Sequence, residues 1–249
     1  EIHMPFDPIQ LEIFKHLFAA IPEEMGAVLQ RSSYSPNIKE RKDYSCALFN
    51  PQGEMIAQAA HIPVHLGAMP LSVQAPLATI RFHPGEMLIL NDPYQGGTHL
   101  PDITLIAPVF AGQQLAGFVA NRAHHADVGG MTPGSMPIAR ELIQEGLILP
   151  PVKLLRSDTI DDDILAIILR NTRTPNERLG DLHAQIAANR RGVRQFSALI
   201  ERYGLQQVFQ HADALLAYTE RMTRALIETI PDGEYTFQDV LDDDGLDDK

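Results

Sequence analysis

Cysteine is nearly absent from this chain of 249 residues, which contains only Cys46. A single cysteine cannot form an internal disulfide, and no thiol competes with oxygen and nitrogen ligands for a metal. Long apolar runs are missing as well, since none approaches the roughly 20 residues that a membrane-spanning helix needs. The first residues also lack the basic, apolar and small-residue order of a secretion signal. We therefore expect a protein of the cytoplasm without a membrane-embedded part.

Basic residues do not outnumber acidic ones either. The chain has 20 Lys and Arg against 32 Asp and Glu, a formal net charge of −12. Surfaces that bind nucleic acid are basic, so a nucleic-acid partner is not expected. The sequence contains neither a GxxxxGK[ST] phosphate loop nor a GxGxxG fingerprint. The chain is therefore not expected to bind a nucleotide on its own.

The patterns along the chain predict an α+β fold, with a mixed, strand-rich N-terminal part followed by long helices. Asp7 and Pro8 favour a helix start, and Pro22 is expected to kink or restart that helix. In the first part we expect strands at 44–49, 55–59 and 87–90 and a helix at 68–82, and beyond it helices at 164–169, 177–202 and 205–229. Alternation over 234–240 predicts a further strand. The expected regions are 1–155 with the functional site, 156–231 helical, and 232–249 as the start of a truncated further domain.

Most of the candidate site residues lie in one stretch, residues 90–130. Its polar residues are Asp92, His99, Asp102, His124, His125 and Asp127. Two strand-like runs, 103–110 and 115–120, separate them, and a hairpin around 111–114 would bring both polar clusters to the same end. Oxygen and nitrogen ligands suit Zn²⁺, Mn²⁺ or Fe²⁺. The alternative is structural, because His and Asp at strand ends also cap turns and bond loop backbone.

Three further candidate residues, one aspartate and two histidines, lie outside this stretch. Asp43 precedes an expected strand, where it is either a metal ligand or a surface carboxylate paired with Arg41 or Lys42. His61 and His65 are four residues apart, but Pro63 between them disfavours a regular helix. These two histidines either line a pocket or bond to loops.

Several longer motifs occur in an order that resembles the hydantoinase B family. They are DPIQLEIF, RSSYSPNIKERKDYSCALFNPQGEMIAQAAHIPVHLG, NDPYQGGTHLPDITL, NRAHHADVGGMTPGSMP and IPDGEY. The family's relatives include a subunit of ATP-dependent hydantoinases and lactamases, half of 5-oxoprolinase, and a subunit of acetone carboxylase. Its members are about twice as long as this chain, so the resemblance implies an N-terminal portion.

The resemblance also implies a division of labour in a hetero-oligomer. A hydantoinase A-type partner subunit binds ATP and phosphorylates the amide oxygen of a small cyclic substrate, and the hydantoinase B-type subunit holds a divalent metal. The family's H-x-x-D pair and later histidine match His99, Asp102 and His124, with Asp43 as an additional or alternative ligand. His125 and Asp127 are the expected catalytic residues, as proton relays or supports of the ligands.

The resemblance thus predicts the metal-bearing subunit of an ATP-dependent hydrolase of hydantoin, 5-oxoproline or another lactam. An acetone carboxylase-like subunit, which joins an enolate to CO₂, is the alternative within the family. A non-catalytic scaffold that docks the ATP-binding partner through the helices of 161–229 is the alternative outside it.

Overall fold

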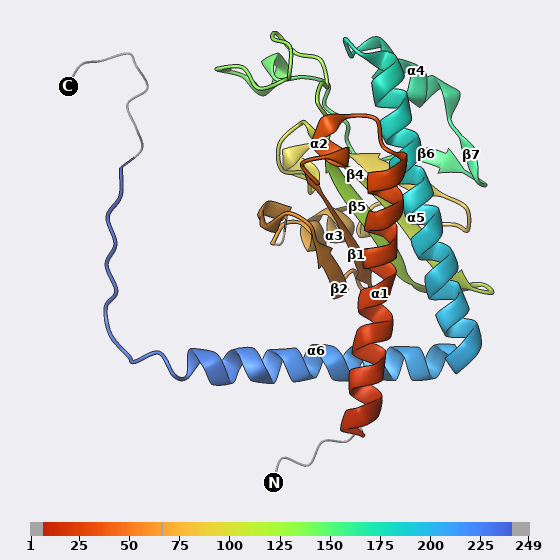
Figure 1. Ribbon diagram of the computed structural model, residues 1–249, viewed down its shortest axis with the longest axis vertical. Helices are drawn as coiled ribbons and strands as arrows, with labels where there is room; N and C mark the ends of the chain where they lie inside the picture. The colour runs from red at the N-terminus through yellow and green to blue at the C-terminus, as the bar shows by residue number, and fades with distance from the viewer. Residues whose placement is uncertain (1–6, 66, 241–249) are drawn as a thin grey trace. The chain divides into compact units, whose positions relative to one another are not determined.

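The computed structural model describes residues 7–65 and 67–240 (Figure 1). Its centre is a seven-stranded antiparallel sheet in the described part of the chain, with the strand order β2-β1-β5-β4-β3-β6-β7. The strands are β1 Tyr44–Phe49, β2 Met55–Ala60, β3 Met87–Leu90, β4 Asp102–Ala111, β5 Gln114–His124, β6 Val152–Arg156 and β7 Thr159–Ile160. The helices are α1 Pro8–Ser32, α2 Pro36–Lys39, α3 Met69–Leu77, α4 Asp162–Arg170, α5 Pro175–Tyr203 and α6 Leu205–Ile227. This arrangement confirms the predicted α+β class.

The predicted hairpin is the centre of the sheet. β4 and β5 pair antiparallel from Asp102 opposite His124 to Ala111 opposite Gln114, joined by a two-residue turn. Gly112 in that turn has φ +62°, a conformation that glycine adopts at little cost. The returning strand is longer than the pattern of 115–120 predicted, because the ladder continues through the polar residues up to His124.

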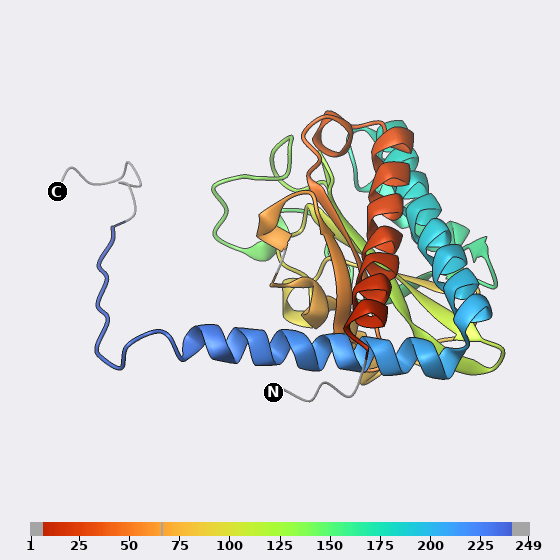
Figure 2. The ribbon, with the colours of Figure 1, turned by 60° about the horizontal axis from the view of Figure 1, so that its bottom comes forward.

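One face of the sheet is covered by α1 and α5, which run side by side (Figures 1 and 2). The Asp7 side chain accepts a hydrogen bond from the Ile9 amide and caps α1, as predicted. Of the two alternatives predicted for Pro22, a kink or a restart, the restart is wrong, since α1 is one helix through that position. Pro22 is buried there, so its packing compensates for the hydrogen bond that its missing N–H removes.

The opposite face carries the shorter helix α3. Its Met69 and Val73 pack into a second apolar cluster with Phe118 of β5 and Ile106 of β4. The helix ends at Leu77 rather than 82, directly after Pro76. Because both faces are covered, the central strands are buried on both sides, and β1 is buried along its whole length.

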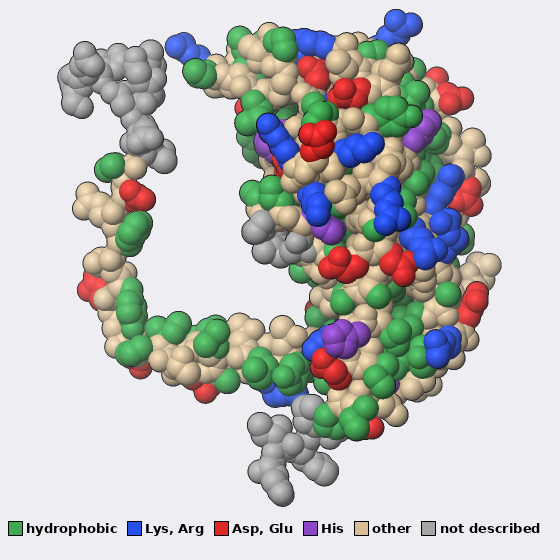
Figure 3. All heavy atoms as spheres, viewed as in Figure 1, with side chains coloured by type: hydrophobic (Ala, Val, Ile, Leu, Met, Phe, Trp, Pro, Cys, Tyr) green, Lys and Arg blue, Asp and Glu red, His purple; other side chains and the backbone are tan. Residues whose placement is uncertain are grey.

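The chain divides into a compact unit of residues 1–215 and a second unit of residues 216–249. Within the second unit, apolar side chains of the last turns of α6 are exposed, among them Met222, Leu226 and Ile227. Figure 3 shows hydrophobic side chains on the surface of this part of the helix. The strand expected at 234–240 is absent, because those residues pair with no described strand. No helix in the described ranges is long and apolar enough to cross a membrane.

Candidate metal centre

The hairpin brings the H-x-x-D pair to the later histidine. Asp102 is the first residue of β4 and His124 the last of β5, and the two are direct partners across the ladder. His99 lies in the turn before β4, where the Asp102 amide donates to the His99 carbonyl. This is the convergence that the two strand-like runs predicted.

Asp102 is the common partner of the two histidines. Its Oδ1 lies 2.9 Å from His99 Nε2 and 3.2 Å from His124 Nδ1. One ligand atom from each of the three residues lies within 4.8 Å of the others. The Asp102 side chain is 6% exposed, that of His124 13% and that of His99 42%. The three residues thus form a partly buried set of ligand atoms that opens towards solvent at His99.

The electrostatics of this set favour an ionised carboxylate. Burial alone would raise the pKa of Asp102, but the surrounding imidazoles of His124, His65 and His99 outweigh it and hold that pKa well below its ordinary value. Conversely, the contact with Asp102 raises the pKa of His99, and burial opposes this only in part. The negative charge of Asp102 is therefore available to a cation at neutral pH.

Asp43 and His65 extend the set on its other side. Asp43 precedes β1, and its Oδ2 and Oδ1 lie 4.0 Å from His124 Nδ1 and His65 Nε2 respectively. His65 ends a short 3₁₀ helix, η1 Pro63–His65, and its Nε2 lies 3.2 Å from Asp102 Oδ2. Sequence reasoning left His65 between a pocket and a loop. The structure brings it to the site, and its four-residue spacing from His61 was the only signal for it.

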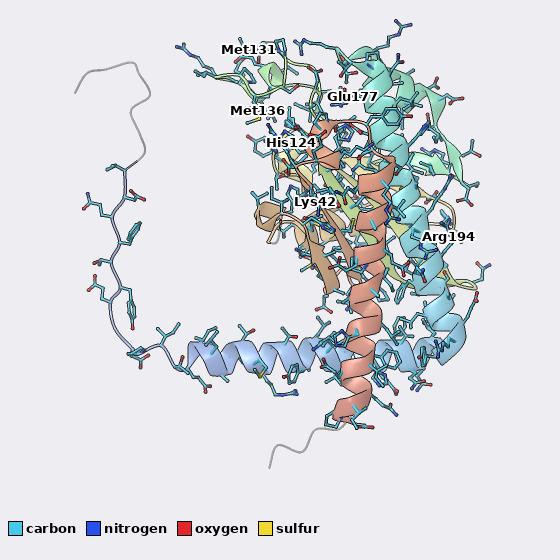
Figure 4. The ribbon with its side chains drawn as sticks, in the orientation of Figure 1. Lys42, His124, Met131, Met136, Glu177 and Arg194 are labelled. Atoms are coloured by element: carbon cyan, nitrogen blue, oxygen red, sulfur yellow. The ribbon has the colours of Figure 1, made fainter. Side chains whose placement is uncertain are left out.

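These residues line an open pocket of about 450 Å³. Its remaining lining is Ile62, Val64 and Thr98. A pocket of this size accepts a small molecule, and its lining combines two apolar side chains with charged groups and imidazoles. The loop after β5 carries exposed Met131 and Met136, which Figure 4 labels on the same side of α1 as Lys42 and His124.

His125 and Asp127 do not join the ligand set. The His125 ring is fully buried and its Nε2 donates to Gln185 Oε1 of α5, at 2.9 Å. Burial, with a smaller contribution from the charge of Arg178, lowers the pKa of His125 to about 4. Asp127 accepts hydrogen bonds from the backbone and side chain of Arg173. Successive residues of an extended chain point to opposite faces, which separates His125 from His124.

Asp92 is also outside the set. Its carboxylate accepts from the Tyr94 amide and caps the short helix η2 Pro93–Gln95. Behind the site, the fully buried Arg122 of β5 donates to Thr104 and Ser72. Burial lowers the pKa of Arg122, and the charge of Asp102 opposes that change.

The donor set fits a divalent metal. Two imidazole nitrogens and a buried, ionised carboxylate oxygen are ligands that Zn²⁺, Mn²⁺ and Fe²⁺ accept. Their separations of 2.9 and 3.2 Å are those expected of atoms that share one ion at about 2.0–2.2 Å. The open side of the pocket leaves room for further ligands.

Comparison with known proteins agrees with the motifs. The family model for hydantoinase B/oxoprolinase matches residues 7–248. The chain is 42% identical over 239 residues to 5-oxoprolinase 1 of Arabidopsis thaliana, covering 90% of this chain and 19% of that protein.

Two solved structures share the fold. The ATP-dependent caprolactamase of Pseudomonas jessenii superposes with a TM-score of 0.86 at 34% identity, over 92% of this chain and 40% of that one. A nucleotide-free acetone carboxylase superposes with a TM-score of 0.78 at 22% identity, over 84% of this chain and 28% of that one. The chain thus spans two fifths or less of each of these proteins.

Proposed function

From the premise that this chain belongs to the hydantoinase B/oxoprolinase family, we propose that it is the metal-bearing part of an ATP-dependent hydrolase of cyclic amides. The reaction is the ring opening of a hydantoin, 5-oxoproline or another lactam. The observation that carries the proposal is the convergence of His99 Nε2, Asp102 Oδ1 and His124 Nδ1 on the wall of an open pocket.

These three residues would hold a divalent ion, with Asp43 as an additional ligand across the pocket. When bound, such an ion supplies a Lewis acid and makes water a better nucleophile at neutral pH. Asp102 contributes the negative charge that attracts the ion. Ile62 and Val64 form the apolar wall against which the methylene part of a lactam ring would pack.

The roles of His125 and Asp127 in this proposal are to position other groups. His125 anchors the end of β5 to α5 through Gln185, directly beside the ligand His124. Asp127 fixes the start of the following loop through Arg173. The hydrogen bonds of the two side chains go to Gln185, Arg173 and Gly129 and not to Asp102, so we assign them positioning roles.

The ATP-dependent step belongs to a hydantoinase A-type partner in this proposal. A neutral amide resists attack by water, and phosphorylation of its oxygen creates a good leaving group. The matched segment covers only 19% of the Arabidopsis relative, so that protein contains other parts of considerable size within one chain. This supports the action of the present chain within a larger assembly.

The hydrolase is favoured over the carboxylase by sequence. The caprolactamase is 34% identical, whereas the acetone carboxylase, at 22%, shares the fold alone. A scaffold without a metal is disfavoured by the buried Asp102 carboxylate, because a structural role does not require three imidazoles around one carboxylate.

Metal content of the purified protein tests the proposal. We expect at least one equivalent of Zn²⁺, Mn²⁺ or Fe²⁺ per chain in the wild type, and one equivalent less in His99→Ala/His124→Ala. His83→Ala, which removes an exposed imidazole from a distant turn, is the control and should retain the metal. Ring opening in the presence of ATP and the partner subunit should then be lost in the double variant only. A wild type without metal, even after supplementation, would favour the scaffold.

A further inference from the structure

His65 lines the same pocket, but the family resemblance assigns it no role at the site. Its side chain is 2% exposed. Its Nε2 lies 3.2 Å from Asp102 Oδ2 and 4.0 Å from Asp43 Oδ1. No hydrogen bond of normal geometry satisfies this nitrogen within the described part of the chain. A buried polar atom without such a bond requires an explanation, because leaving it unpaired costs about 1–3 kcal/mol.

The other ring nitrogen of His65 has a partner. Nδ1 lies 3.1 Å from the hydroxyl oxygen of Ser45, which is fully buried in β1. When Nδ1–H donates to Ser45 Oγ, the lone pair of Nε2 points towards the two carboxylates. Histidines that bind metals are held in this way, with the second nitrogen donating to a neighbouring group.

In each of the two carboxylates, one oxygen lies nearer His124 and the other lies nearer His65. Asp102 directs Oδ1 to His99 and His124, and Oδ2 to His65. Asp43 has Oδ2 nearer His124 and Oδ1 nearer His65. Each position therefore has at least one imidazole and one oxygen from each carboxylate.

We propose that His65 Nε2, Asp102 Oδ2 and Asp43 Oδ1 form a second divalent-metal position beside the one held by His99, Asp102 and His124. The proposal rests on the proposed function, since it takes the first position as given. Asp43 and Asp102 would contribute one oxygen each to both positions, and His65 would serve the second alone.

The net charge of the site residues is consistent with binding two divalent ions. Three neutral imidazoles and two carboxylates carry a net charge of −2, which one divalent ion neutralises and two ions convert to +2. A site of charge +2 suits a substrate that carries a phosphoryl group, as the proposed activated amide does. Sites with two metals about 3.5–4 Å apart are common where an oxygen attacks and a phosphorylated oxygen leaves.

The number of bound ions tests this proposal directly. The purified protein is stripped of metal, saturated with Mn²⁺, and its bound ions are counted by equilibrium dialysis. We expect two Mn²⁺ per chain in the wild type and one in His65→Ala. His61→Ala, which removes the other imidazole of the same segment, should still bind two. One ion in the wild type overturns the second position and leaves the proposed function intact, whereas none overturns both.

A measurement on the wild type alone tests the proposal even if the variants fail to fold. Anomalous diffraction from crystals saturated with Mn²⁺ should show two peaks in the pocket, one of them beside His65. A single peak overturns the proposal whatever the variants do. Equal Mn²⁺ binding by wild type and a folded His65→Ala protein, checked by circular dichroism, overturns it as well.

Discussion

Asp102 and His124 are partners across the β4–β5 hairpin, and Asp102 Oδ1 lies 3.2 Å from His124 Nδ1. Their meeting depends on the register of a ladder whose turn lies at the far end, at Gly112. A slip of one residue would turn one of the two side chains to the opposite face of the sheet. The geometry of the candidate site therefore depends on the register of the β4–β5 hairpin.

Gly117 of β5 is a position where the hairpin tolerates no side chain. Its φ is +151°, and a Cβ there would lie 2.2 Å from the carbonyl oxygen of Phe49 in the neighbouring strand. We expect Gly117→Ala to lower the free energy of unfolding by about 3 kcal/mol or more, at the upper end of single substitutions. Denaturant unfolding measures this.

Gly112→Ala is the matched control for that substitution. Gly112 also has positive φ, but a Cβ there meets nothing within 4 Å. Only the backbone penalty remains, about 1–2 kcal/mol. Equal losses in both variants would show that the contact with Phe49 does not limit this strand.

Replacing Asp102 by asparagine should weaken metal binding strongly. Asp102→Asn removes the charge that the imidazoles of His124, His65 and His99 stabilise, while it keeps the shape of the side chain. We expect metal affinity to fall by more than about 100-fold, beyond the 10–100-fold typical of residues that only support a ligand. Isothermal titration with Mn²⁺ measures the change.

Asp92→Asn is the control for this carboxylate. Asparagine caps a helix as well as aspartate does, so η2 should persist and the metal affinity should stay unchanged. If Asp92→Asn lost the metal as Asp102→Asn does, general acidity rather than the Asp102 ligand would attract the ion.

Gln185 joins α5 to both strands of the hairpin. Its Nε2 donates to the Ile103 carbonyl and to Asn121 Oδ1, and its Oε1 accepts from His125. Gln185→Ala would leave these buried groups unpaired, each at about 1–3 kcal/mol. We expect a loss of about 3 kcal/mol or more in thermal or denaturant unfolding, against less than about 0.5 kcal/mol for Gln206→Ala on the surface of α6. A loss below about 1 kcal/mol would mean that water replaces the amide.

Asp127 should make stability depend on acid pH. Burial raises the pKa of Asp127, but the hydrogen bonds from the Arg173 backbone and side chain and from Gly129 outweigh it and lower the pKa in the folded state. Such a carboxylate stabilises the fold fully above its unfolded pKa of about 3.9, and this contribution disappears as the pH falls through the folded value.

The variant Asp127→Asn isolates that contribution. Its free energy of unfolding should be lower than that of the wild type by about 1–3 kcal/mol at pH 7, and the difference should shrink below pH 4. Urea unfolding at several pH values between 7 and 3 follows the change. A difference that is independent of pH would assign the effect to shape rather than to the charge of Asp127.

The sequence by itself determined most of the local elements and which residues are candidate metal ligands. Alternation over 103–110 and 115–120 predicted the hairpin, because side chains of a strand repeat every two residues. Asp7 before Pro8 predicted the start of α1. The H-x-x-D pair and the later histidine predicted the convergence of His99, Asp102 and His124, because a hairpin returns to the end at which it began.

Only the tertiary structure decided which side chains from distant parts of the sequence come into contact. His65 follows the outer strand β2 and contacts Asp102, which its four-residue spacing from His61 left open. The His125 side chain points away from the site, to the face of the sheet that α5 covers, where it contacts Gln185. Pro22 stays inside one helix because buried packing outweighs a lost hydrogen bond, and 234–240 forms no strand because a strand needs a paired neighbour. Sequence patterns record the preferences of neighbouring residues, whereas such contacts join residues that are far apart along the chain.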